Sequence, residues 1–276
     1  MKSITEVELP LLKKRSNDEE NKLDTLFSSA KKNILNIYCT AGYPQLESTA
    51  TVMLALQKHG ADIIELGIPY SDPIADGPVI QQSNMHALES GISIKKIFLQ
   101  LNEIKEQLHI PVILMGYLNP VMQYGLENFC RDAAAAGVSG IILPDLPMYE
   151  FEHFHKVLFN KYALHFIFLI SPQTSQERIQ KADKLSKGFI YAVSSSATTG
   201  KETNFKQQQS YFKKIKNMNL HNPVLIGFGI KDKSTFDMAC RYASGAIIGS
   251  AYIKALQGSS NIEETTALFI KNIRTP

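Results

Sequence analysis

Short apolar runs recur along the chain from Leu23 onward, and turn residues bound each of them. Such runs are typical of strands that are buried on both faces of a parallel sheet. Between them lie longer stretches whose apolar residues repeat at three- and four-residue spacing, as they do in amphipathic helices. The pattern predicts eight strands, over Leu35–Cys39, Asp62–Leu66, Val112–Met115, Gly140–Leu143, His165–Leu169, Phe189–Val193, Val224–Gly227 and Ala246–Ile248.

Helices are predicted between these strands. Strands that alternate with helices indicate βαβ units and a parallel sheet. Eight such units in about 250 residues predict a (β/α)8 TIM barrel of the α/β class, with a doubly wound sheet as the competing architecture. The expected helices cover Ser48–His59, Ile92–Leu108, Leu126–Ala136, Gln176–Leu185, Ser234–Tyr242 and Ile262–Ile273, with weaker patterns over Glu150–Phe159 and Phe205–Met218.

The spacing of the predicted strands favours the barrel and reveals an inserted loop after strand 2. Six of the seven steps between strand starts suit one strand plus one helix, but the second step runs from residue 62 to residue 112. In a barrel, the loops that follow the strands carry the chemistry. The inserted segment is therefore the first place to look for a site.

Residues 1–20 differ from the rest of the chain. They hold a basic run, Lys13–Arg15, and an acidic run, Asp18–Glu20, with little periodicity, so we expect a flexible N-terminal extension. No linker rich in Pro, Gly or Ser interrupts residues 21–276, which we expect to form a single barrel domain.

Composition narrows the class of protein further. The chain has 276 residues, 44% of them hydrophobic, which excludes a disordered chain. A net charge of +3 gives no argument for nucleic-acid binding. No apolar run approaches the ~20 residues of a membrane span, and no apolar segment of a signal peptide follows Met1. Three scattered cysteines are typical of a reduced, cytoplasmic protein.

Carboxylates mark the end of the second predicted strand. Glu65 lies there, and if its side faces the barrel mouth, burial raises its pKa and suits a general acid or base. A glutamate that pairs with a cation or faces solvent is the equal alternative. Asp72 and Asp76 follow in a loop stiffened by proline, either as active-site groups or as turn residues. We expect no metal site, because among the other strand ends only Asp145 adds a carboxylate.

Small residues follow the last three predicted strands, in Ser194–Gly200, Gly227–Gly229 and Gly249–Ala251. Their exposed backbone N–H groups, with a helix beginning after the last of them, form a phosphate site that needs no Lys or Arg. Glycines needed only for tight turns are the alternative. The segment around residues 194–204 is either a lid or a surface loop. Tyr38, Tyr117 and Tyr191, at strand ends, either wall a flat ligand or fill the barrel.

Five segments of the sequence resemble the tryptophan synthase alpha chain family, over about Leu23 to Ile273. The resemblance implies a (β/α)8 barrel and a lyase of tryptophan biosynthesis that cleaves indole-3-glycerol phosphate to indole and glyceraldehyde 3-phosphate. The most specific segment is Glu65–Pro78, and the others are Met115–Pro120, Leu143–Pro147, Gly227–Ile230 and Gly249–Ala251.

The resemblance also implies roles for single residues. Glu65 and Asp76 match the catalytic acids. Many relatives carry an arginine where this chain has Ser195 and a glycine where it has Ala197. Phosphate contacts fall on Gly200, Gly229, Gly249 and Ser250, with Thr199 in the lid and with Asp72 and Pro73 facing a partner chain. Tyr117 and Tyr191 are predicted to contact the substrate from their positions at strand ends, not from the resemblance.

The implied partner is a tryptophan synthase beta chain in an α2β2 complex. Pyridoxal phosphate belongs to that beta chain, and we expect no cofactor in this one. The alternatives are a free-standing lyase, a non-catalytic activating subunit, and a phosphate-binding barrel of another class, such as a sugar-phosphate isomerase or a thiamin-phosphate-type transferase. Glu65 and Asp76 are both present, which argues against the non-catalytic subunit.

Overall fold

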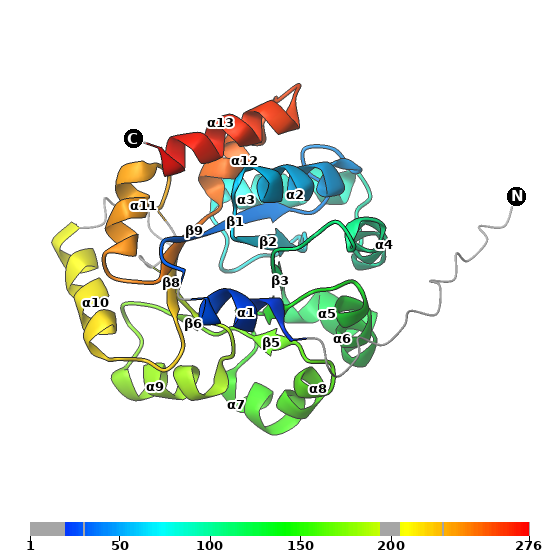
Figure 1. Ribbon diagram of the computed structural model, residues 1–276. Coiled ribbons are helices and arrows are strands. Elements are labelled where there is room, and N and C mark those ends of the chain that lie inside the picture. The colour runs from blue at the N-terminus through cyan, green and yellow to red at the C-terminus, as the bar shows by residue number, and fades with distance from the viewer. Residues whose placement is uncertain (1–19, 30, 194–204, 228, 276) are drawn as a thin grey trace, which may run out of the picture.

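The computed structural model describes residues 20–275 except 30, 194–204 and 228. In this part of the chain, helices surround a cylinder of parallel strands (Figure 1), so the predicted barrel is confirmed. The described strands are β1 (Ile34–Thr40), β2 (Ile63–Gly67), β3 (Val112–Met115), β4 (Gly140–Ile142), β5 (His165–Phe166), β6 (Leu169–Ile170), β7 (Ile190–Val193), β8 (Val224–Gly227) and β9 (Gly245–Ile248).

The sheet runs in the order β5-β4-β3-β2-β1-β9-β8-β7-β6, with every pair parallel. Its two edges, β5 and β6, are neighbours in the chain. The backbone N–H of Ile167 donates to the carbonyl of Ile141 on one side, and that of Tyr191 donates to the carbonyl of Phe168 on the other. Residues 165–170 therefore close the ring, because they bond to both edges.

The fifth strand differs from the prediction of one continuous run over His165–Leu169. It is divided into two short pieces, β5 against β4 and β6 against β7. Between the pieces, the backbone N–H of Phe168 donates to the Ser186 hydroxyl at 3.1 Å rather than to a neighbouring strand. The division arises because this stretch changes partner midway.

The predicted helices are present with small shifts at their ends, and α2 and α9 have the predicted bounds. The 50-residue step between the second and third predicted strands holds two helices, α3 and α4, where one was expected. The described helices are α1 (Lys22–Ser28), α2 (Ser48–His59), α3 (Pro78–Glu89), α4 (Ile94–Ile104), α5 (Leu118–Tyr124), α6 (Leu126–Ala135), α7 (Met148–Glu150), the π-helix η1 (Phe151–His155), α8 (Lys156–Lys161), α9 (Gln176–Leu185), α10 (Phe205–Asn217), α11 (Lys233–Cys240), α12 (Ser250–Leu256) and α13 (Ile262–Arg274).

Side chains that alternate along each strand build two separate cores. One face of the strands packs against the helices in a large outer cluster. The other face fills the barrel itself, with Ile34 of β1, Ile113 of β3 and Leu225 of β8 among the residues with no exposed surface. The layers of the inner core nearest the carboxyl ends of the strands contain the polar groups described below.

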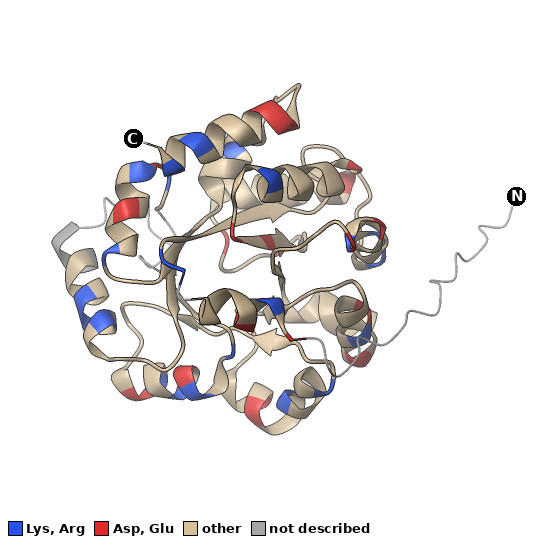
Figure 2. Cartoon of the chain, viewed as in Figure 1, with Lys and Arg blue, Asp and Glu red and all other residues tan. Residues whose placement is uncertain are grey.

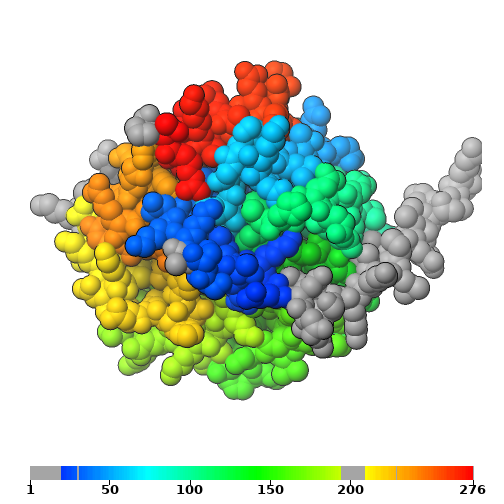
Figure 3. All heavy atoms as spheres, viewed as in Figure 1, coloured from blue at the N-terminus to red at the C-terminus, as the bar shows by residue number. Residues whose placement is uncertain are grey.

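Helix α1 closes the end of the barrel at which the strands begin, and no sequence pattern predicted it. Leu23 is fully buried and packs into the inner core, and the ring of Phe27 lies 6.1 Å from that of Phe189. The side chain of Asn21 caps the helix and donates to the carbonyls of Ser139 and Ala163. Figure 3 shows this dark-blue segment over the centre of the molecule. Nearly all of the expected extension, residues 1–19, lies outside the described residues.

Charged side chains of both signs are interspersed over the outer helices (Figure 2). Within the described ranges, none of the helices combines the length and the apolar character needed to span a membrane.

Candidate active site

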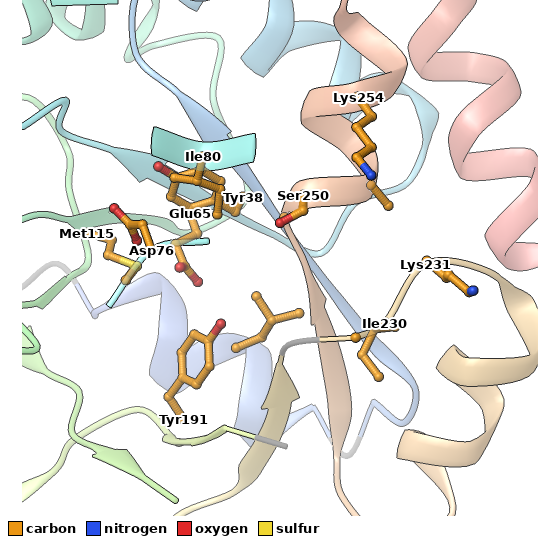
Figure 4. Close-up of a pocket in the computed structure, with 14 residues that line it drawn as sticks. Tyr38, Glu65, Asp76, Ile80, Met115, Tyr191, Ile230, Lys231, Ser250 and Lys254 are labelled. Atoms are coloured by element: carbon orange, nitrogen blue, oxygen red, sulfur yellow. The ribbon is translucent and has the colours of Figure 1, made fainter. Parts of the chain in front are cut away.

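A cavity of about 310 Å³ opens at the end of the barrel where the strands finish. Its volume falls at the lower end of the range for small-molecule sites. Five strands each contribute one inward side chain, and the other residues come from the segments that follow β2, β8 and β9 (Figure 4). The lining residues are Tyr38, Glu65, Asp76, Ile80, Met115, Tyr191, Gly229, Ile230, Lys231, Ile247, Gly249, Ser250, Ala251 and Lys254.

Glu65 is an inward residue of β2 with 1% of its surface exposed. Its Oε2 accepts a hydrogen bond from Nδ2 of Asn36 on β1, at 2.8 Å. Burial raises the pKa of Glu65 to about 8; the hydrogen bond from Asn36 lowers this pKa, and the charge of Asp76 raises it. The geometry thus favours a buried carboxyl group over one that faces solvent.

Asp76 lies in the inserted segment, between β2 and α3. The side chain of Asn84 on α3 donates to its Oδ2 at 3.3 Å, and that of Gln81 donates to its backbone carbonyl at 2.8 Å. Burial raises the pKa of Asp76 to about 6, while hydrogen bonds from Tyr117 and Asn84 lower it. The unpredicted helix α3 therefore holds Asp76 at the cavity.

Tyr117 is not among the described residues that line the cavity, but it forms a hydrogen bond with Asp76, which does line it. Its hydroxyl accepts from the backbone N–H of Ala75 at 3.0 Å, and its ring lies 5.2 Å from that of Tyr70. The geometry makes Tyr117 a support for the Asp76 loop. Its predicted contact with substrate stays a prediction.

Two buried tyrosines, Tyr38 and Tyr191, form walls of the cavity. Each phenol lies over a glycine: a Cβ atom at Gly67 would be 2.1 Å from Oη of Tyr38, and one at Gly227 would be 2.4 Å from Oη of Tyr191. Figure 4 shows the hydroxyl of Tyr191 directed toward Glu65. The two glycines are required because any larger residue would displace these phenols.

Gly229, Gly249 and Ser250 also line the cavity. Figure 4 shows Ser250 and Ile230, the chain neighbours of Gly249 and Gly229, on the side of the cavity away from Glu65. Gly229 has a φ of +75°, a conformation that favours glycine. Gly249 has a φ of −119° and immediately precedes α12. Two other residues with predicted roles, Thr199 and Gly200, lie outside the described residues together with the rest of 194–204.

Two lysines line this end of the cavity, and the sequence analysis did not single them out. Lys231 follows Gly229 by two residues, and Lys254 lies one helical turn beyond Ser250. Both are exposed, and neither ammonium group forms an ion pair within the described residues. Their positions relative to the two glycine loops were the signal that could have identified them.

Asp72 and Pro73 lie outside the cavity lining, in the loop between β2 and α3. Asp72 is exposed, and the Ser71 hydroxyl donates to its Oδ2 at 2.5 Å. Asp145 has a local partner as well, because both its carboxylate oxygens accept from the N–H of Leu118. Among the described residues, no three Asp, Glu, His or Cys side chains gather in a way that could hold a metal ion.

Comparison with known proteins gives one consistent family. A family model described as tryptophan synthase alpha chain matches residues 25–274. A tryptophan synthase alpha chain from Bacteroides thetaiotaomicron is 48% identical over 245 residues, which cover 88% of this chain and 96% of the relative.

Solved structures agree with this similarity. The crystal structure of the tryptophan synthase alpha chain from Legionella pneumophila has a TM-score of 0.83 and 33% identity, and the match covers 93% of this chain and 97% of that one. A chain in the crystal structure of the tryptophan synthase complex from Pyrococcus furiosus has a TM-score of 0.79 and 32% identity, over 88% of this chain and 98% of that one.

Proposed function

This chain belongs to the tryptophan synthase alpha chain family, lyases of tryptophan biosynthesis, and we propose that it cleaves indole-3-glycerol phosphate to indole and glyceraldehyde 3-phosphate. One observation carries the proposal. One end of the cavity is bordered by two acids, the buried carboxyl group of Glu65, with a pKa near 8, and the carboxylate of Asp76. The other end is lined by Gly229, Gly249 and Ser250. A substrate with an indole ring and a phosphate group matches those two ends.

The reaction is a retro-aldol cleavage that begins with protonation of the ring. Glu65, protonated at neutral pH, donates its proton to C3 of indole, and the ring nitrogen takes up the positive charge. Asp76 accepts a hydrogen bond from the ring N–H and stabilises that charge.

The ionised Glu65 then accepts the proton of the side-chain hydroxyl. The electron pair of the O–H bond forms the aldehyde carbonyl, the carbon–carbon bond breaks, and its electrons neutralise the ring as indole leaves. Glu65 ends the cycle protonated, so protons balance and no oxidant or reductant is needed.

The phosphate group positions the ring without reacting. Backbone N–H groups of Gly229, Gly249 and Ser250 bind it in this proposal, and the ammonium groups of Lys231 and Lys254 add positive charge at the same end. Binding energy from a remote group holds the reacting atoms in alignment. Gly200 and Thr199 keep the roles that the family resemblance implies, as a phosphate contact and as part of a lid.

A beta-chain partner completes the proposal, in an α2β2 complex in which the beta chain holds pyridoxal phosphate. The solved complex from Pyrococcus furiosus supports an assembled state for this family. The docking surface includes Asp72, Pro73 and the neighbouring Ile74, which is 73% exposed. Because Asp76 lies in the same loop, docking fixes the geometry of a catalytic group, and a displacement near 1 Å costs ~100-fold in rate.

The test measures indole released from indole-3-glycerol phosphate by the chain alone and during titration with its cognate beta chain. We expect weak basal turnover and a roughly ten- to hundredfold activation. Equal rates with and without the partner identify a free-standing lyase. Absence of indole in both cases, with stimulation of the beta chain alone, identifies a non-catalytic activating subunit.

A further inference from the structure

Asn36 is a fully buried amide inside the barrel, on a strand that is otherwise apolar between Ile34 and Cys39 except for the phenol of Tyr38. Its Nδ2 donates to Glu65, and its Oδ1 has no hydrogen-bond partner. Burying an amide with one unsatisfied oxygen costs free energy, which an apolar residue of the same shape would avoid. The fold alone therefore gives no reason for an amide here, whereas the neighbouring carboxyl group does.

The position of Asn36 separates it from any substrate. It does not belong to the described lining of the cavity, whereas Glu65 does. In the strand register, Asn36 pairs with Ile63 and Tyr38 pairs with Glu65, so Asn36 lies one inward layer closer to the start of the strands. Its only described side-chain hydrogen bond is the one to Glu65. Any effect of Asn36 on the reaction must pass through that bond.

We propose that Asn36 is a positioning residue that holds the carboxyl group of Glu65 toward the cavity and favours its ionised form. The inference rests on the proposed function, because it concerns the acid of that reaction. A donor fixed beneath the carboxylate limits its rotation and stabilises the state that forms once the proton has been given to the ring.

Other titratable groups also face Glu65, and only one of them carries charge near neutral pH. Asp76 raises the pKa of Glu65 through repulsion. Tyr38, Cys39 and Tyr191 interact electrostatically with Glu65, but burial raises the pKa of each well above its usual value, so these groups stay neutral. Burial and the charge of Asp76 both raise the pKa of Glu65. Among the described residues, Asn36 is the group that lowers it.

The first experiment measures kcat, KM and the pH profile of Asn36→Leu, an apolar variant of similar shape. We expect kcat to fall ~10- to 100-fold because the carboxyl group is no longer held, while KM changes less than about threefold. Loss of the donor moves the alkaline limb of kcat/KM upward by about one pH unit. Wild-type kcat and an unmoved alkaline limb would overturn the inference.

Two further variants separate positioning from general damage to the core. Gln100→Leu is the matched control, because Gln100 is also a buried amide with one unpaired oxygen but donates to the carbonyl of Leu46 in the outer core. It should leave the pH profile unchanged. Asn36→Ala also removes the donor and adds no charge, so it moves the alkaline limb in the same direction if Asn36→Leu fails to fold.

A measurement that does not depend on enzyme activity tests this inference separately from the proposed function. The titration of Glu65 is followed by carbon-13 NMR of labelled glutamate carboxyl groups, with the signal assigned by its loss in Glu65→Gln. We expect a midpoint near 8 in the wild type and a higher midpoint in Asn36→Leu. Equal midpoints reject the role of Asn36 even if indole is formed. A raised midpoint supports that role even if the chain cleaves a different substrate.

Discussion

Two buried carboxyl groups, one just before β2 and one within it, have opposite surroundings. Asp62, just before β2, is 4% exposed; it accepts the N–H of Leu35 and forms ion pairs of 2.5 Å with Lys31 and Arg274. Glu65, three residues later, is 1% exposed and has the amide of Asn36 as its one described hydrogen-bond partner. Asp62 is therefore paired with cations, whereas Glu65 has no described cation as a partner.

The difference indicates that the two acids have different roles, one in stability and one in the proposed reaction. At the end where strands begin, Arg274 of α13 also bonds to the carbonyls of Asn33 and Gly60, so Asp62 anchors the last helix to the barrel. Toward the end where strands finish, no cation among the described residues lowers the pKa of Glu65, which stays raised. A buried acid without a cation costs stability, and in the proposed reaction this acid supplies the proton.

The largest expected contrast is in turnover. Glu65→Gln keeps the shape of the side chain but removes the proton donor, so kcat should fall ~10²- to 10⁴-fold while the protein stays folded. Asp76→Asn should also lose activity, because an amide cannot balance the charge on the ring. Steady-state assays and circular dichroism test both. More than a tenth of wild-type kcat in Glu65→Gln would exclude Glu65 as the acid.

The second contrast is in stability. Asp62→Asn leaves Lys31 and Arg274 without their anion, and we expect the free energy of unfolding to fall by about 3 kcal/mol with kcat unchanged. Urea denaturation measures this loss. Glu263→Gln is the matched control, because its carboxylate contacts Lys58 and His59 at the surface, where losing such contacts should change stability little. Equal losses in both variants would contradict the anchoring role of Asp62.

The third contrast is in pH dependence. Asp76 must be ionised and Glu65 protonated, so kcat/KM should be highest between about 6 and about 8 and fall about tenfold per unit outside that window. Initial rates over a range of pH measure it. A profile that stays flat through pH 9 would contradict the assignment of Glu65 as the acid.

The same raised pKa has a consequence for folding. Folded Glu65 keeps its proton up to a pH of about 8, whereas the unfolded group loses it near 4.5. The folded state therefore binds more protons in that window, and stability falls as pH rises through it. Glu65→Gln should remove this part of the pH dependence, whereas Gln100→Leu should retain it.

The repeat of strands and helices could be predicted because it depends on local patterning, as the bounds of α2 and α9 show. The division of the fifth strand could not, since it depends on which neighbours close the ring. Glu65 and Asp76 lie in one distinctive segment, Glu65–Pro78, which is why the sequence pointed to them; both line the cavity, and their catalytic roles stay predictions. Asn36 was missed because a single polar residue in a strand has no meaning until the pairing of β1 with β2 brings it to Glu65.

The smallest contrast is between two kinds of exposed lysine. Lys254 lines the end of the cavity that is proposed to bind phosphate, whereas Lys271 on α13 lies elsewhere on the surface and is not in the described lining. An exposed charge contributes up to about 1 kcal/mol, or roughly fivefold in binding. Lys254→Gln should therefore raise KM for indole-3-glycerol phosphate two- to fivefold, with kcat unchanged because the phosphate does not react.

Ionic strength provides a second test of the same contact. Screening weakens an exposed ionic contact, so raising the ionic strength should increase KM of the wild type more than that of Lys254→Gln. Lys231→Gln should behave in the same way, and the double variant should show a larger increase in KM than either single one. Lys271→Gln should match the wild type at every salt concentration. If Lys254→Gln and Lys271→Gln are indistinguishable, the proposed phosphate site gains nothing from the ammonium group of Lys254.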